Sequence, residues 1–530
     1  MTTKKGAAKI GGRVNVGWAA ALLAGSTLFG SLLGLLKERL ILANFGFSIQ
    51  TDAYRAAFAL PDFMYFMLIA GTLSVSFIPI FSQRYHGGNK KSAWEVTSSL
   101  LNLIGLLAMV SGVFLMLFAG PILRNLIAPG LDPDTQFLAV SMMRVFAINP
   151  ILFGISSVLT SVQQAKGRFL FYALAPSVYS LGIIFGTVVL SPRLGIFGVA
   201  YGVAIGAVAQ LVVVTLGLRG QGLRYSPKIF WKNKGFKKVL KTAPTRSADQ
   251  GIDYVTQLIE LNRASGLAVG SIASYTAALQ LFNVPVNLVG MAISTAAFPK
   301  MSERLGQGRP DLFRKELQQT IRVMFWMAVP ATILTFFCRG YLSRILASTG
   351  QPIVASIVGI LSFLLTFKVL YHILARAFYA QQDTKTPLKV SIVTMIINVT
   401  LLFYLSSPER YGLSGLAIAA AITGSLEVVA LAILLNKKMG NGLFTDGLFQ
   451  PIFKMLAIGG ATALVSYTMV ALLPVDSSDQ GFFPLIPKFL AICTVSSVFY
   501  GILSYFAKLQ EIRPFVNKAV KLFKKPVIIQ

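Results

Sequence analysis

The stretch SVSFIPIFSQRYHGG at residues 74–88 recurs 220 residues later as STAAFPKMSERLGQG at residues 294–308. Aligned without a gap, the two stretches share two serines, a proline, an arginine and the final glycine. The register continues through the next apolar run, where identical residues occupy these paired positions: Gly120 and Gly340, Arg124 and Arg344, Leu126 and Leu346, Gly130 and Gly350. A duplicated unit long enough to cross a membrane indicates a transporter with two lobes around a central path.

Composition places the chain in the membrane. Of its 530 residues, 55% are hydrophobic and 13% are charged, and a soluble protein cannot cover that much apolar surface. Runs of about 20 apolar residues, each long enough to cross the hydrocarbon layer, predict an all-α polytopic protein rather than a barrel. The predicted spans are 15–42, 50–83, 93–119, 135–162, 169–191, 196–218, 238–263, 268–303, 314–338, 353–380, 387–406, 413–436, 452–473 and 484–506.

The net charge of +29 follows the predicted loops. Basic residues cluster before the first span and in every second connection, whereas the last outer loop holds Asp476 and Asp479 and no base. The positive-inside rule then predicts a multi-pass protein of the cell membrane with both termini in the cytoplasm. Because no basic and aromatic module accompanies the charge, we expect membrane lipids and no nucleic acid as partners.

The repeat and the loop charges together define the predicted domains. Pro79 and Pro299 both end a span on the cytoplasmic side, so the two copies are parallel. We therefore predict two parallel six-helix lobes around a central cavity, followed by two further helices. The predicted boundaries are 1–218 for the first lobe, 219–241 for a basic linker, 242–437 for the second lobe and 438–530 for the last two spans and a basic tail.

The seventh predicted span carries a polar stripe. Arg246, Asp249, Asp253, Gln257 and Glu260 are spaced so that they share one helical face. The stripe either pairs internally to stabilise a lobe contact or lines a water-filled cavity, and the cost of burying it dry favours the cavity. No nucleotide-binding loop, nucleophile constellation, cofactor motif or metal-ligand spacing accompanies it. We predict a transporter, not an enzyme, with its three carboxylates as candidate sites for Na⁺ or H⁺.

The first two spans also carry charges. Lys37 and Arg39 either snorkel to the headgroups or face a cavity, and Asp52 and Arg55 belong to a similar polar face. The remaining intramembrane charges are isolated in the sequence, and we assign most of them to packing or to the membrane interface. They are Arg144, Arg322, Lys368, Arg376 and Glu427.

Several motifs resemble those of the MurJ (MviN) family. The stretch FYAQQDTKTPLK at residues 378–389 is similar to a signature of that family. Shorter matches are the segments TDAY at 51–54, LPD at 60–62, GTLSVSFIPIFS at 71–82, APG at 128–130, RF at 168–169 and AP at 175–176. The resemblance covers almost the whole chain. It implies a flippase of the multidrug and oligosaccharidyl-lipid exporter superfamily that moves lipid II, an undecaprenyl-pyrophosphate-linked precursor, to the outer leaflet by alternating access.

The resemblance also implies functional residues, and here the chain departs from the family pattern. The family's arginines in helices one, two and eight correspond to Gly30-Ser31, Lys37, Tyr65-Phe66 and Gln280, and a nearby acid corresponds to Asn283; Asp52 is retained. Pyrophosphate favours Arg or Lys donors. The expected substrate-binding residues are therefore Lys37, Arg39, Asp52, Arg55, Arg246, Gln257 and Gln280. The family's cation site maps onto Asp249 or Asp253 with Asn398 and Thr423, beside Glu260.

Two alternatives remain open at this stage. The chain could export another polyprenyl-linked glycan, since so many cavity arginines differ. It could also be a non-transporting membrane scaffold for cell-wall synthesis enzymes, although the retained stripe on the seventh span argues against a scaffold. Cell-wall synthesis enzymes are candidate partners for each of these functions.

Overall fold

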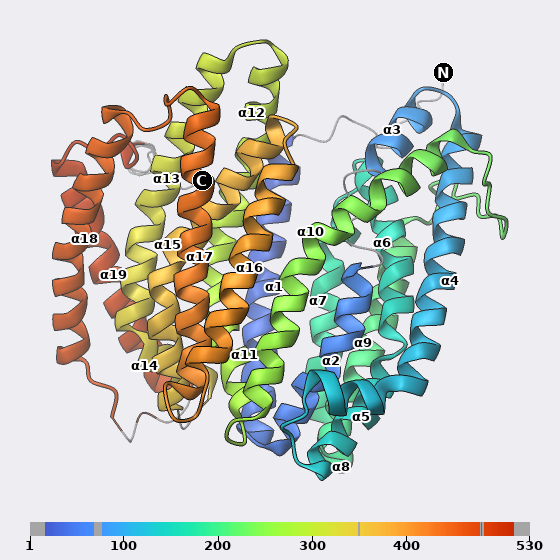
Figure 1. Cartoon of the computed structure of the whole chain (residues 1–530), viewed down its shortest axis with the longest axis horizontal. Coiled ribbons are helices and arrows are strands. Elements are labelled where there is room, and N and C mark those ends of the chain that lie inside the picture. Colours follow the sequence, from blue (N-terminus) through green and yellow to red (C-terminus); the bar gives the residue numbers. More distant parts are fainter. Residues whose placement is uncertain (1–15, 68–76, 348–349, 477–478, 480–481, 514–530) are drawn as a thin grey trace, which may run out of the picture. The chain divides into compact units, whose positions relative to one another are not determined.

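The computed structural model of the chain describes residues 16–67, 77–347, 350–476, 479 and 482–513, and these ranges fold into helices joined by short turns (Figure 1). Within these described ranges, eleven helical stretches are long and apolar enough to cross a membrane. They are Lys90–Ile127, Pro133–Ala165, Leu170–Leu194, Ile196–Gly217, Ser271–Gly306, Pro310–Phe337, Pro352–Ala380, Lys385–Leu405, Gly412–Lys438, Asp446–Leu472 and Pro484–Phe506. The all-helical, multi-pass class predicted from the sequence is confirmed.

The predicted count of fourteen spans is not confirmed. The three predicted spans outside the eleven coincide with α1 (Val16–Phe45), α2 (Ile49–Tyr65) and α10 (Lys234–Ser265). Both α2 and α10 carry several of the charged residues identified above, and each charge lowers the mean hydropathy of these helices. Residues 19–36 of α1 contain no charge, but the side chains of the first part of this helix lie outside the described part of the chain. The helices therefore form where expected, but composition alone does not mark α2 and α10 as membrane spans.

The chain divides into two compact units. Unit 1 comprises Met1–Lys37, Leu60–Ala119 and Met142–Gly251, and unit 2 comprises Glu38–Ala59, Gly120–Ser141 and Ile252–Gln530. The helices α1, α2, α5 (Pro133–Phe146) and α10 each contribute residues to both units. The lobe boundaries predicted from the sequence stay a prediction.

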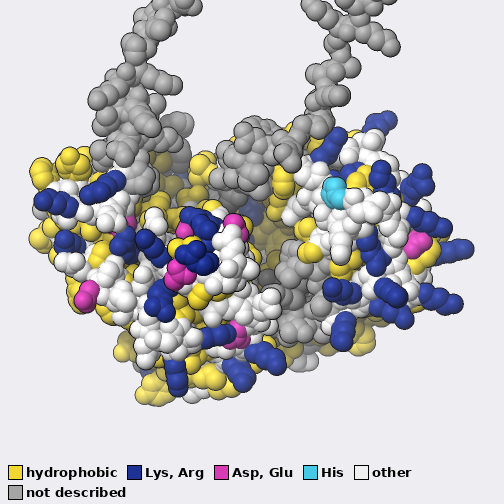
Figure 2. Space-filling model, turned by 90° about the horizontal axis from the view of Figure 1, so that it is seen from above, with side chains coloured by type: hydrophobic (Ala, Val, Ile, Leu, Met, Phe, Trp, Pro, Cys, Tyr) yellow, Lys and Arg dark blue, Asp and Glu magenta, His cyan; other side chains and the backbone are white. Residues whose placement is uncertain are grey.

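Unit 1 is held together by close packing of glycine-bearing helices. Its helices include α3 (Ile78–His86), α4 (Lys90–Ile122), whose last three residues belong to unit 2, α6 (Asn149–Ala165), α7 (Leu170–Phe185), α8 (Ser191–Leu194) and α9 (Ile196–Gly217), with a π-helical turn at Gly186–Leu190. A Cβ added to Gly182 of α7 would lie 2.2 Å from the Cα of Gly206 in α9. Glycine at such crossings lets two membrane helices approach closely. The end of unit 1 at which α3 lies is rich in Lys and Arg side chains (Figure 2).

Unit 2 is built around α15 (Pro352–Ala380). This helix packs against α11 (Ser271–Pro285), α13 (Pro310–Phe337) and α17 (Gly412–Lys438). Further elements of the unit are the π-helical turn at Leu123–Ile127, η5 (Val286–Met291), α12 (Ala292–Gly306), α14 (Arg339–Leu346), α16 (Lys385–Leu405), α18 (Asp446–Leu472) and α19 (Phe482–Phe506). The helices α18 and α19 pack on each other and on α13.

The sequence repeat corresponds to a repeated helix–turn–helix. Gly88, with φ 89°, separates α3 from α4, and Gly308, with φ 68°, separates α12 from α13. Both backbones lie in the left-handed region that favours glycine. The repeated glycines are therefore explained by turn geometry.

The signature stretch at residues 378–389 is a helix-start motif. Asp383 accepts hydrogen bonds from the backbone N–H of Thr386 at 3.0 Å and from its hydroxyl at 2.8 Å, at the start of α16. Lys438 of α17 lies 2.6 Å from the same carboxylate. Burial raises the pKa of Asp383, but the bonds from Lys438 and Thr386 outweigh it and lower the pKa to about 2. The motif thus joins the start of α16 to the end of α17.

We expect the Asp383 contacts to weaken in acid. Because the folded pKa of about 2 lies below the usual 3.8, the stabilisation is present above pH 4 and is lost as the pH falls toward 2. Lys438 is partly exposed, so the contribution is below about 1 kcal/mol. Thermal unfolding of the detergent-solubilised Asp383→Asn variant should show a lower Tm than the parent at pH 6, and the gap should narrow at pH 3. A gap that persists unchanged at pH 3 would contradict this assignment.

Candidate functional site

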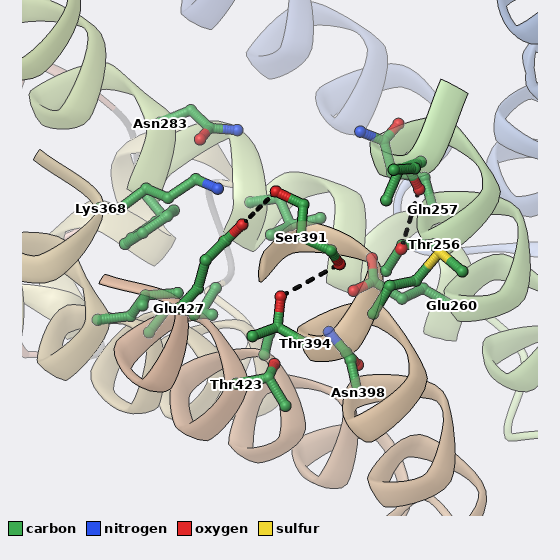
Figure 3. A pocket seen from close by; sticks show the side chains of 18 of the residues that line it. Thr256, Gln257, Glu260, Asn283, Lys368, Ser391, Thr394, Asn398, Thr423 and Glu427 are labelled. Atoms are coloured by element: carbon green, nitrogen blue, oxygen red, sulfur yellow. Dashed lines mark hydrogen bonds between the residues drawn. The ribbon is translucent and has the colours of Figure 1, made fainter. Parts of the chain in front are cut away.

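A polar cavity lies within unit 2. Its volume is about 300 Å³, and its walls come from α10, α11, α15, α16 and α17. The polar residues that line it are Thr256, Gln257, Glu260, Tyr275, Asn283, Lys368, Ser391, Thr394, Asn398, Thr423 and Glu427 (Figure 3). Polar groups inside a membrane protein are costly unless they pair or face water. The cavity is therefore the candidate functional site of this unit.

One side of the cavity is formed by the C-terminal half of α10 (Figure 3). Glu260 is only 8% exposed, and Thr256 and Gln257 precede it by four and three residues, which places all three on neighbouring positions of one helical face. The Thr256 hydroxyl donates to the carbonyl of Ile252 at 3.1 Å, so its lone pairs stay available. This side presents a carboxylate, a hydroxyl and an amide to the cavity.

The helices α16 and α17 add further oxygen atoms. Among the described residues, the side-chain oxygen of Asn398 is buried without a hydrogen-bond partner, which is costly unless a ligand or water satisfies it. The hydroxyl of Thr423, 3% exposed, donates to the carbonyl of Ala419 at 2.7 Å and keeps its lone pairs. Carboxylate, amide and hydroxyl oxygens together suit a hard cation such as Na⁺. The residues present therefore fit the cation site that the resemblance implies.

The other side of the cavity holds charges that appear isolated in the sequence, where packing or an interfacial position is predicted for them. The Ser391 hydroxyl donates to a carboxylate oxygen of Glu427 at 2.7 Å, and Lys368 lines the same side (Figure 3). Two spacings in the sequence could have identified them. Ser391 precedes Asn398 by seven residues, and Glu427 follows Thr423 by four, so each pair shares a helical face.

The structure brings together only part of the predicted set. Gln257, Glu260, Asn398 and Thr423, drawn from three helices, line one cavity. Gln280, on α11, is half-buried and does not line it. Lys37 belongs to unit 1, within electrostatic range of Asp62. The side chains of Arg246, Asp249 and Asp253 lie outside the described part of the chain.

Arg39 and Arg55 are occupied by partners within unit 2. A guanidinium nitrogen of Arg39 donates to the backbone carbonyl of Ile345. Arg55 forms an ion pair with Glu38, whose side chain is fully buried. The Arg55 guanidinium also lies 5.3 Å from the centre of the Tyr54 ring. In this state both arginines hold helices together, so binding a pyrophosphate would require them to exchange partners.

Asp52 caps a neighbouring helix. Its two carboxylate oxygens accept the backbone N–H groups of Gly270 at 2.6 Å and Ala273 at 2.8 Å, at the start of α11. A carboxylate at a helix N-terminus satisfies unpaired N–H groups and complements the helix dipole. The preceding Thr51 does the same for α2, since its hydroxyl oxygen accepts the N–H of Ser48 at 2.9 Å. The TDAY motif thus joins α2 to α11.

We expect Asp52→Ala to destabilise the protein by roughly 2–3 kcal/mol, because two buried donors lose a charged acceptor. The Tm values of Asp52→Ala, Asp52→Asn and the parent protein, measured in detergent, check this prediction. The Asn side chain can satisfy one donor and should be intermediate. Equal Tm values for Asp52→Ala and the parent would remove the capping role.

The chain matches known proteins along most of its length. The family model described as "Lipid II flippase MurJ" matches residues 41–487. The chain belongs to the MurJ family. Membership of this family makes it a transporter rather than an enzyme. Among the relatives, the lipid II flippase MurJ of Burkholderia cenocepacia is 26% identical over 458 residues, covering 83% of this chain and 86% of that protein. The probable lipid II flippase MurJ of Thermotoga maritima is 26% identical over 437 residues, covering 80% and 87%.

Solved structures agree on the fold. A lipid II flippase MurJ in an inward closed conformation superposes with a TM-score of 0.75 at 22% identity, covering 91% of this chain and 99% of that chain. An inward-facing multidrug resistance MATE transporter of the MOP superfamily gives 0.68 at 15% identity, covering 78% and 95%. The MurJ-family chain therefore shares its helical architecture with exporters of that superfamily.

Proposed function

We propose that this chain is a flippase that moves lipid II from the inner to the outer leaflet of the cytoplasmic membrane by alternating access. The observation that carries the proposal is the family match over residues 41–487, which reaches from the end of α1 to the start of α19. We place both termini in the cytoplasm, because the distribution of basic residues among the loops favours that orientation. The substrate's headgroup is anionic and large, so it needs a hydrated path while its tail stays in lipid.

The cavity of unit 2 is the proposed coupling site. A cation or proton held by Glu260, Asn398 and Thr423 would join α10, α16 and α17, and its release would loosen those contacts. The buried amide oxygen of Asn398, which has no hydrogen-bond partner in the part of the chain that the structure describes, supports a ligand at this place. An ion that binds one conformation better than the other shifts the equilibrium between them.

Complementation tests the proposal. The chain is expressed in a bacterium whose own lipid II flippase is depleted, and lipid II at the outer face is measured with an externally added enzyme that cleaves only exposed precursor. Restored growth and restored cleavage are the expected results. Restored cleavage should also appear in proteoliposomes loaded with lipid II.

A second substrate distinguishes lipid II transport from the alternative function, the export of another polyprenyl-linked glycan. Proteoliposomes carrying another undecaprenyl-pyrophosphate-linked glycan serve as the comparison, because the lipid and pyrophosphate are the same and only the glycan differs. Faster export of that glycan than of lipid II would replace the proposed substrate. Transport of neither, with the protein folded, would favour a scaffold for cell-wall synthesis enzymes.

A further inference from the structure

The linker between α9 and α10 is a fixed element of unit 1. We name residues 219–241 the basic strap; it comprises the linker and the first turns of α10. Its backbone is bonded to the side chains of α4: Ser98 accepts the N–H of Ser226 at 3.0 Å, and Ser99 accepts the N–H of Phe230 at 2.8 Å. Side chains that satisfy loop backbone groups hold a loop in one conformation.

Further contacts anchor both ends of the strap. Near its start, the Lys166 ammonium donates to the carbonyl of Gln221 at 2.7 Å. Toward its end, the Asn233 amide donates to Glu95 at 2.9 Å. Phe236 and Val239 are fully buried in the core of unit 1. One face of the strap is thus committed to the protein.

The other face is basic and open. The strap contains eight Lys and Arg residues and no acidic residue. All eight side chains are exposed: Arg219, Arg224, Lys228, Lys232, Lys234, Lys237, Lys238 and Lys241. Two aromatic side chains, Tyr225 and Trp231, are also more than half exposed. Figure 2 shows this end of unit 1 covered by dark-blue side chains with few magenta ones.

The strap lies beside the start of the lipid-facing surface of α4. Asn102 donates to the carbonyl of Ser226 at 2.8 Å and accepts the hydroxyl of Tyr225 at 2.7 Å. Large exposed apolar side chains on α4 begin at Leu106, only four residues, or about 6 Å, further along the helix. Aromatic and basic residues at such a border are typical of the headgroup layer.

We propose that the basic strap is a binding surface for the anionic headgroups of membrane phospholipids. Its cations are mostly lysines, six of the eight, which act as separate point charges rather than as the paired forks that suit one pyrophosphate. They are spread along an exposed segment, so they match several singly charged headgroups instead of one doubly charged ligand. The strap then holds unit 1 against the inner surface of the bilayer through electrostatic attraction and through Trp231 and Tyr225.

Lipid-selective quenching tests the proposal without any transport step. The full-length protein is placed in phosphatidylcholine nanodiscs that contain either spin-labelled phosphatidylglycerol or spin-labelled phosphatidylcholine, and the part of the fluorescence removed by Trp231→Phe reports on the strap. We expect stronger quenching by labelled phosphatidylglycerol at equal content, with a preference that declines as salt rises. Equal quenching by both labels in the parent protein would overturn the proposal.

Charge removal identifies the residues responsible. The variant Lys228→Gln/Lys232→Gln/Lys234→Gln should lose at least about fivefold of the preference for phosphatidylglycerol, the effect of one lysine near an anionic surface. The matched control, Lys315→Gln/Lys385→Gln/Lys437→Gln, removes three exposed lysines from unit 2 and should keep it. Equal loss in both variants would show a response to net charge and would overturn the assignment. Displacement of the labelled phosphatidylglycerol by stoichiometric undecaprenyl pyrophosphate would instead assign the strap to the substrate. Tm values and gel-filtration profiles confirm that each variant is folded.

Discussion

Glu260→Gln is expected to abolish ion-dependent flipping while leaving the protein folded. The substitution keeps the shape of the side chain and removes the only charge that the described side chains of α10 bring to the cavity. Truncating one partner of a buried charge pair costs about 2–5 kcal/mol, which lowers the affinity for a cation about 30-fold or more. Flipping of lipid II in proteoliposomes, measured against Na⁺ concentration and against pH, checks this.

Two companion variants make the result specific. Asn398→Ala removes a neutral oxygen that lacks a hydrogen-bond partner among the described residues, and it should weaken the ion dependence less than Glu260→Gln. Glu427→Gln changes the carboxylate on the opposite side, which is bonded to Ser391, and serves as the matched control. If Glu427→Gln abolished the ion dependence and Glu260→Gln left it intact, the coupling site would lie on the α15–α17 side instead.

The fold could be predicted because its cause is local. Runs of apolar residues, punctuated by turn residues such as Gly88 and Gly308, mark helices without knowledge of their partners. The cavity was partly predictable for the same reason: Gln257 and Glu260 share one helical face. Asn398 and Thr423 came only from the family resemblance, although each shares a helical face with a second polar residue, Ser391 and Glu427 respectively.

The roles of the charged residues in α1 and α2 could not be predicted from local sequence patterns. The family resemblance predicts that Asp52 binds the substrate. In the structure this residue caps α11, whose first residue lies more than 200 residues away in the sequence. Lys368 and Glu427 appear isolated in the sequence, but α15 and α17 bring them to one cavity. Such pairings depend on which helices pack together, which helical periodicity does not specify.

Breaking the ion pair of Glu38 and Arg55 should cause the largest loss of stability among single substitutions. Glu38 is fully buried and Arg55 is 15% exposed at the side chain, and they join α1 to α2. Removing one partner from a buried pair costs about 3–5 kcal/mol, because the other charge is left uncompensated. We expect Arg55→Gln to lower the Tm in detergent strongly and to reduce the yield of folded protein.

The double variant Glu38→Gln/Arg55→Gln tells whether the pair itself is responsible. With both charges removed, two amides can hydrogen-bond at the same place, and the large cost of one stranded charge disappears. We therefore expect its Tm to lie above that of Arg55→Gln, so that the two substitutions are not additive. An additive loss would mean that each side chain acts through separate contacts, such as that of Arg55 with the Tyr54 ring. If the double variant is stable and still flips lipid II, Arg55 is not required for headgroup binding, and the pair's role is to hold α1 and α2 together.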